Sequence, residues 1–277
     1  MIEEDISLKT LSAYANALQK QGKISFRLDE AASTLGITLV AARLSAHRLS
    51  KKKRIFRAYR NFYIIVPLEY QNMGCPPPNW FIAPLMEHMG TNYYVGLLSA
   101  AALHGATHQQ PMIFQVVTSK YPRVIHVPSM DIHVYQSRYI YERGIEQKKT
   151  PTGFINVSTP ELTAFDLVRY PRASDHYQHI AMVLTELGEH LRPKRLATLV
   201  RGICQEHGEW IYGQRLGYLL DCVGFQESAD SLAEYILKYQ PSFGYLIPGR
   251  PDTAFEKSER WRLYINDKIE AEMEVKE

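Results

Sequence analysis

The chain has 277 residues, of which 45% are hydrophobic and 22% charged, and its formal net charge is +3. This composition is that of a globular protein, and no apolar run approaches the roughly 20 residues that a membrane-spanning helix needs. The N-terminal stretch lacks the apolar segment of a signal peptide, and Cys75, Cys204 and Cys222 form no Cys-x-x-Cys pair. We therefore expect a cytoplasmic protein of two or more domains, without a disulfide framework, a bound metal or a cofactor.

The charge is unevenly distributed along the chain. Residues 1–70 hold 12 Lys/Arg and 6 Asp/Glu, a net of +6, so the remainder carries a net of −3. No acidic side chain lies between Glu30 and Glu69, whereas residues 43–60 carry eight cations. A block of one sign indicates a polyanionic partner, most often nucleic acid. The alternative is a solvated basic face without a partner.

The N-terminal pattern predicts short helices separated by caps and turns. Ser7 can cap a first helix with apolar positions from Leu8 to Leu18, and Gly22 can end it. Residues 23–28 alternate as a strand does. Asp29 can cap a helix over 30–35, Gly36 provides a tight turn, and Thr38 can cap a helix over 39–53.

The helix over 39–53 has two distinct faces. An inward face is expected to contain Leu39, Ala42, Ala46 and Leu49. An outward face is expected to contain Val40, Arg43, Leu44, His47 and Lys51. Small residues at 41, 42, 45 and 46 would let this helix approach another surface closely.

Residues 54–66 predict a strand, a basic turn at 59–61 and a second strand, which is a β-hairpin. Two helices joined by a short turn and followed by a basic hairpin are typical of a winged helix, whose second helix enters the DNA major groove. The predicted contacts with double-stranded DNA are Thr38, Val40, Arg43, His47, Arg48, Lys51, Lys52, Arg57, Tyr59, Arg60 and Asn61.

The overall prediction is an α+β protein with a winged helix on 1–70, a proline-rich linker on 71–80 and a mixed α/β domain on 81–277. Within the last domain, residues 84–104 look helical. Strands are expected at 112–118, 124–127, 131–137, 154–158 and 260–266. Helices are expected at 160–170, 174–190, 193–207, 211–223 and 228–239.

Several stretches resemble the AbiEi-type antitoxins, a family also described as predicted regulators of viral defence. The most specific stretch is NYYVGLLSAAALHGATHQQPMIFQVVTSK (92–120), and the remaining ones follow in the expected order: 157–171, 213–224 and 249–270. The basic run Lys51–Arg54 departs from the family's pattern because it lacks the glycine that commonly separates helix from wing.

The resemblance implies a DNA-binding N-terminal domain and a C-terminal antitoxin domain. It implies repression of the protein's own operon through repeated promoter sites. It also implies neutralisation of an AbiEii-type nucleotidyltransferase toxin in phage defence, without a stable complex. The alternative function is a winged-helix regulator or docking module without antitoxin activity.

Enzymatic chemistry is not expected. His104 and His108 have the spacing of a helical metal site, but Gly105 favours a helix stop between them, with the His104 ring bonded to backbone. His176 with His179, and His126 with His133, are interpreted as structural. A metal-dependent nuclease built on Asp131, Glu146 and Lys148 is a weaker alternative, since residues 146–149 resemble a polar loop.

Overall fold

The structure is a computed structural model that describes residues 9–106, 112–120, 123–174, 176–250 and 254–269. The chain folds into two compact units. Unit 1 contains the segments Met1–Tyr93, Met112–Ile140 and Gln147–Asn156, and unit 2 contains Tyr94–Pro111, Tyr141–Glu146 and Val157–Glu277. Each unit is therefore assembled from segments that are far apart in the sequence.

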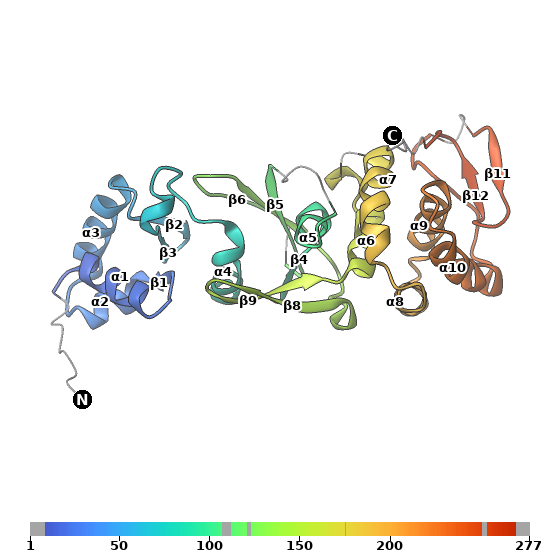
Figure 1. The fold of residues 1–277 in the computed structure, drawn as a ribbon. Helices are drawn as coiled ribbons and strands as arrows, with labels where there is room; N and C mark the ends of the chain where they lie inside the picture. The colour runs from blue at the N-terminus through green and yellow to red at the C-terminus, as the bar shows by residue number, and fades with distance from the viewer. Residues whose placement is uncertain (1–8, 107–111, 121–122, 175, 251–253, 270–277) are drawn as a thin grey trace. The chain divides into compact units, whose positions relative to one another are not determined.

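Unit 1 begins with three helices and a small antiparallel sheet (Figure 1). The strand order is β1-β3-β2. The core combines side chains from every one of these elements, including Leu11, Phe26, Ala46 and Ile55. In chain order the elements are α1 (Leu11–Lys20), β1 (Ser25–Arg27), α2 (Leu28–Thr34), α3 (Leu39–Lys51), β2 (Ile55–Tyr59) and β3 (Phe62–Ile65).

Two of the predicted helix starts are wrong, and the third is confirmed. The cap of α1 is Thr10, whose Oγ1 accepts from Ala13 N at 3.1 Å, while Ser7 lies outside the described residues. Helix α2 begins at Leu28, so Asp29 lies inside the helix and is not its cap. The Asp29 carboxylate accepts hydrogen bonds from the Arg27 side chain and from the Glu30 amide. Thr38 caps α3 as predicted.

The prediction of one helix over 84–104 is wrong, because strand β4 (Tyr93–Val95) separates α4 (Ile82–His88) from α5 (Leu97–Leu103). Gly90 adopts a φ of 61°, which suits glycine and ends the α4 turn. Tyr93, Tyr94 and Val95 are buried, and aromatic and β-branched side chains favour a strand there.

A six-stranded sheet has the strand order β6-β7-β5-β4-β9-β8. The predicted strands are confirmed as β5 (Ile113–Thr118), β6 (Arg123–His126), β7 (Asp131–Gln136) and β9 (Gly153–Ser158). Strand β8 (Ile145–Thr150) replaces the polar loop expected there. The turn at Pro151–Gly153 is the sequence signal for a hairpin that could have revealed this strand.

Residues 71–80 are packed within unit 1. Cys75 is 1% exposed, Pro76 and Pro78 are buried, and Pro128 lies close to Gly74. Trp80 O accepts from Thr152 Oγ1 at 2.5 Å. The short 3-10 helices η1 (Leu68–Tyr70) and η2 (Pro78–Trp80) flank this stretch. The domain boundaries expected from the sequence stay a prediction.

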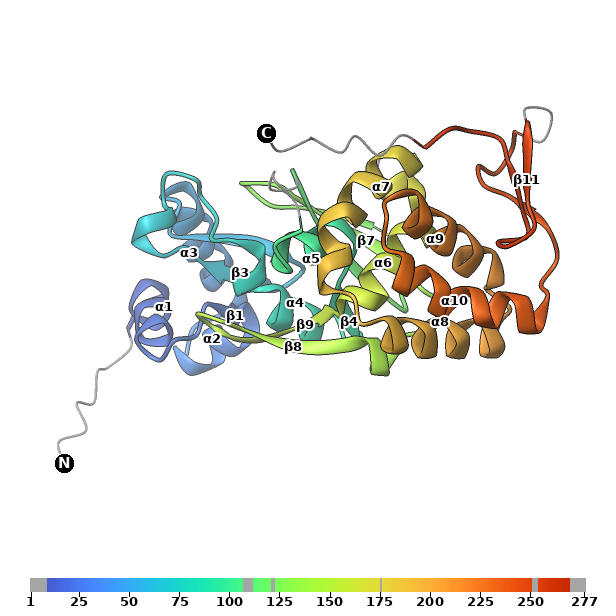
Figure 2. The same cartoon turned by 45° about the vertical axis from the view of Figure 1, so that its right-hand side comes forward.

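Unit 2 is largely helical and ends in a small sheet (Figure 2). All side chains of residues 161–168 on α6 are buried, because α5, α7, α8 and α9 contact this helix. The helices agree closely with the predicted ranges: α6 (Pro160–Arg169), α7 (His176–Leu187), α8 (Pro193–His207), α9 (Trp210–Cys222) and α10 (Gln226–Tyr239). Shorter 3-10 helices are η3 (Glu142–Gly144), η4 (Pro171–Ala173) and η5 (Gly188–His190).

The final sheet has the order β10-β12-β11, and a large buried side chain packs it against the helices. Trp261 is 1% exposed, and its indole Nε1 donates to Asp221 on α9 at 2.6 Å. The predicted strand over 260–266 is confirmed in its centre as β12. The three strands are β10 (Gly244–Tyr245), β11 (Glu256–Ser258) and β12 (Leu263–Ile265). No helix among the described residues has the length and apolar character to cross a membrane.

Candidate nucleic-acid interface

Helix α3 presents a buried and an exposed face, largely as predicted. Ala42 and Ala46 are fully buried, and Leu49 packs against the same core. Leu39 was expected on this inner face, but it is 38% exposed because it lies in the first helical position, beyond the supporting core. The exposed basic residues of the helix are Arg43, His47, Arg48 and Lys51, followed by Lys52 at the C-cap.

The exposed face of α3 also carries large apolar side chains. Val40 is 64% exposed and Leu44 is 56% exposed, one helical turn apart. Ala41 and Ser45 are small residues beside them. The helix contains no carboxylate, so its charged groups are all of one sign. A helix of this kind can approach a polyanion without like-charge repulsion.

The predicted hairpin is confirmed, with β2 and β3 in antiparallel register and a tight turn at Arg60 and Asn61. Asn61 has a φ of 60°, which asparagine tolerates better than most residues. The register shifts between Arg57 and Tyr59, so a bulge twists the end of β2. Arg57 and Arg60 are exposed.

The turn of the hairpin is tied to other parts of unit 1. Tyr59 OH accepts from Arg123 Nη1 on β6 at 2.9 Å. The Arg60 carbonyl lies 2.9 Å from His88 Nε2 on α4. Asn61 O accepts from the Leu28 amide at 3.0 Å, and its side chain bonds Asp29. These contacts fix the turn, while the Arg57 and Arg60 side chains remain available at the surface.

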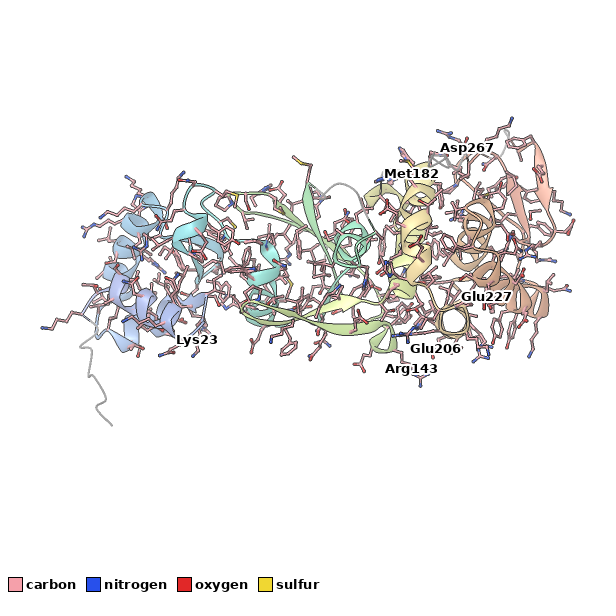
Figure 3. The ribbon with its side chains drawn as sticks, viewed as in Figure 1. Lys23, Arg143, Met182, Glu206, Glu227 and Asp267 are labelled. Carbon is pink, nitrogen blue, oxygen red and sulfur yellow. The ribbon has the colours of Figure 1, made fainter. Side chains whose placement is uncertain are left out.

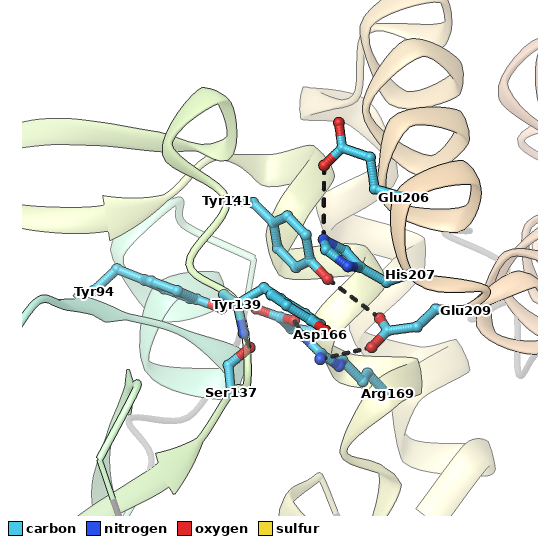
Figure 4. A network of polar contacts seen from close by, with 9 residues as sticks. All are labelled: Tyr94, Ser137, Tyr139, Tyr141, Asp166, Arg169, Glu206, His207 and Glu209. Carbon is cyan, nitrogen blue, oxygen red and sulfur yellow. Dashed lines mark hydrogen bonds and ion pairs between the residues drawn. The ribbon is translucent and has the colours of Figure 1, made fainter.

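A second polar cluster lies in unit 2 (Figure 4). Tyr94 OH on β4 donates to Asp166 Oδ2 on α6 at 2.7 Å. Arg169 Nη1 lies 3.9 Å from Asp166 Oδ1, and Arg169 Nη2 donates to Glu209 Oε1 at 2.8 Å. Asp166 is fully buried, and burial raises its pKa from 3.8 to about 6 even though Arg169 and Tyr94 act to lower it.

The cluster extends towards the surface at the α8–α9 turn. Tyr141 OH lies 3.5 Å from Glu209 Oε2, and the Tyr141 ring lies 5.5 Å from the His207 ring. His207 Nε2 is 3.6 Å from Glu206, which lies at the surface of unit 2 (Figure 3). This cluster was not predicted from the sequence. Asp166 and Arg169 lie on a helix with an ordinary N-terminal cap, where polar residues usually face solvent, so their spacing gave no sign of a buried contact.

His104, the first of the two histidines considered as a metal site, lies at the C-terminal end of a helix. Helix α5 ends at Leu103, and Gly105 has a φ of 79°, so the predicted helix stop is confirmed. His104 Nε2 lies 2.7 Å from the Ser158 carbonyl, as expected of a ring bonded to backbone. His108 lies outside the described residues. Within those that are described, no group of three His, Cys, Asp or Glu could hold a metal ion.

The other candidate residues have structural partners. His126 Nδ1 lies 2.8 Å from Asp131 Oδ1 across the β6–β7 pair, in register. His133 is opposite Val124 rather than His126. His179 Nδ1 lies 2.9 Å from the Ser174 carbonyl at the start of α7. The His126 and His179 rings are thus accounted for without a ligand.

Comparison with known proteins defines the class of the molecule. Residues 94–222, which include α5, the buried cluster and α6–α9, match the family model described as the AbiEi antitoxin C-terminal domain. This is an antitoxin domain, which supports a role in a toxin–antitoxin system. Residues 94–222 are similar to the C-terminal domain of the AbiEi antitoxins, and the resemblance noted in the sequence is confirmed over this part of the chain.

The fold has a solved relative. The chain is similar to the crystal structure of RV2827C protein from Mycobacterium tuberculosis, with a TM-score of 0.62 and 13% sequence identity. The similarity covers 92% of this chain and 90% of that chain, and at this identity it concerns the fold. No curated protein matches the chain.

Proposed function

We propose that the protein is a DNA-binding antitoxin that represses its own operon and neutralises a nucleotidyltransferase-type toxin in phage defence. The single observation that carries the DNA-binding part is the exposed, one-signed face of α3. The antitoxin part is supported by the family match over residues 94–222. The proposal requires neither catalysis nor a cofactor.

In this proposal residues 1–70 act as a winged helix-turn-helix. The element order α1-β1-α2-α3-β2-β3, the short α2–α3 turn and the β2–β3 hairpin support it. Residues 71–80 would join this part to an antitoxin domain on 81–277, although several of their side chains are buried.

The α3 face would enter the major groove and the hairpin cations would contact the backbone. Arg43, His47 and Arg48 are placed to reach base edges or phosphates, since they lie on the outer side of the helix. Lys51, Lys52, Arg57 and Arg60 would contact phosphates. Thr38 would help to hold the helix start, and Tyr59 and Asn61 would hold the hairpin turn through the intramolecular bonds described above.

The DNA-binding part is tested by fluorescence anisotropy on the DNA upstream of the gene. Replacing Arg43 and Arg48 together by Ala is expected to weaken binding at least tenfold at physiological salt and to reduce the salt slope by about two, since each phosphate contact contributes about one. The matched control is Arg143→Ala, which removes an exposed cation from unit 2. Equal affinity of the double variant and the wild type would refute the assigned surface.

The antitoxin part is tested by co-expression with the neighbouring nucleotidyltransferase gene. The full chain is expected to restore growth when the toxin is induced, and the Arg43→Ala, Arg48→Ala double variant is expected to retain that rescue. Lack of rescue by the wild type would favour a regulator or docking module without antitoxin activity.

A further inference from the structure

The exposed face of α3 contains apolar surface that attraction to a polyanion does not explain. Val40 and Leu44 are 64% and 56% exposed, although they lie on a helix that packs into a core on its other side. Arg43 and His47 stand beside them with the same four-residue spacing. The helix therefore presents an apolar ridge, Val40 and Leu44, next to a ridge of basic residues, Arg43 and His47.

The spacing of this apolar ridge fits the repeat of double-stranded DNA. Residues four apart on a helix lie on one face, about 6 Å apart along its axis. Successive base pairs are about 3.4 Å apart, so two such side chains can reach bases one or two steps apart. Ala41 and Ser45 flank the apolar ridge on the side away from Arg43 and His47, and these small residues leave room for close approach.

The major groove offers one apolar group to such a ridge, the C5 methyl of thymine. We propose that Val40 and Leu44 read thymine methyl groups at neighbouring steps of the target site, with Arg43 and His47 on the adjoining base edges or phosphates. This inference rests on the proposed function, in which α3 lies in the major groove. It identifies the preferred DNA as one with thymines in the stretch of major groove that α3 contacts.

The test uses the full-length protein and the upstream DNA segment that it protects in footprinting. Every thymine in the protected segment is replaced by deoxyuridine, which removes the methyl groups and keeps base pairing. Burying one methyl group is worth about fourfold in affinity, so loss of the contacted methyls is expected to weaken wild-type binding by roughly tenfold.

The variants Val40→Ala and Leu44→Ala separate a direct contact from an effect on DNA shape. Each is expected to bind thymine DNA several-fold more weakly than the wild type. Each is also expected to lose part of the discrimination between thymine and uracil, and the double variant nearly all of it. The matched control is Leu237→Ala on α10, since Leu237 is also 56% exposed, and it should keep full discrimination.

The outcomes distinguish the two proposals. Wild-type protein that binds no double-stranded DNA would overturn the proposed function itself. Site-specific binding with equal affinity for thymine DNA and deoxyuridine DNA would overturn only the proposed contacts with thymine methyl groups. Discrimination between the two DNAs that survives in the double variant would have the same consequence. Binding without a preferred site would do the same. The double variant could instead lose affinity equally for thymine DNA and for deoxyuridine DNA, and sediment as a smaller oligomer than the wild type. That result would overturn the thymine contact and assign Val40 and Leu44 to a contact between copies of the chain.

Discussion

The buried carboxyl of Asp166 should make unit 2 less stable as the pH rises from about 4 to 6. The group is fully buried, and its Oδ1 makes no hydrogen bond within the described part of the chain. Tyr94 OH donates to Oδ2, and Arg169 lies 3.9 Å from Oδ1. Burial nevertheless raises the pKa of Asp166 to about 6, so the protonated acid is favoured in the folded state.

The size of the effect follows from the two pKa values. Because the folded pKa lies above the unfolded value, the stability contributed by protonated Asp166 is fully present below about pH 4. It is lost as the pH rises through the folded pKa. A rise of the Asp166 pKa from 3.8 to about 6 on folding corresponds to about 3 kcal/mol of unfolding free energy. Above pH 6, the ionised group costs the folded state that amount relative to the unfolded chain.

The assay is urea denaturation at pH values from 4 to 7.5, followed by tryptophan fluorescence, to which Trp210 and buried Trp261 in unit 2 contribute together with Trp80 in unit 1. The free energy of unfolding of the wild type minus that of Asp166→Asn is expected to fall by about 3 kcal/mol across this range. The control Asp230→Asn removes an exposed carboxyl whose pKa is lowered by Arg260. It should not remove the decline between pH 4 and 6.

A difference between wild type and Asp166→Asn that stays constant across this range would refute the reasoning. It would mean that Asp166 keeps an ordinary pKa and that Arg169 fully offsets the cost of burial. An increase of this difference with pH would mean that the attraction between Arg169 and ionised Asp166 exceeds the cost of burying the charge.

Two further predictions concern packing within each unit. Gly217→Ala would place a methyl group inside the van der Waals radius of the Trp261 ring, so unit 2 should lose at least about 3 kcal/mol of stability in urea denaturation. Gly202→Ala on α8 meets no neighbouring atom and should stabilise by up to about 1 kcal/mol; equal effects of the two would contradict the packing. Arg123→Ala removes the bond to Tyr59, so proteolysis at the hairpin turn should become faster, and Tyr59→Phe should reproduce part of that change. An unchanged cleavage rate would show that the bond does not hold the turn.

The sequence alone was sufficient where structure depends on near neighbours. Thr38 as a cap and the helix stop at Gly105 follow from contacts within a few residues, and the inward face with Ala42 and Ala46 follows from the helical spacing of apolar residues. The hairpin and helices α6 to α10 were predicted for the same reason. The family likeness was also readable, because it depends on the order of short motifs.

Tertiary structure decided what depends on distant segments. Strand β4 interrupts the expected helix because a sheet buries Tyr94, and β8 forms because it can pair beside β9. The hairpin turn is fixed by partners 28 and 64 residues away, namely His88 and Arg123. The pKa of Asp166 rises because folding removes that side chain from water, and no local pattern records such burial. Local propensity sets caps and faces, whereas strand pairing and desolvation are properties of the assembled core.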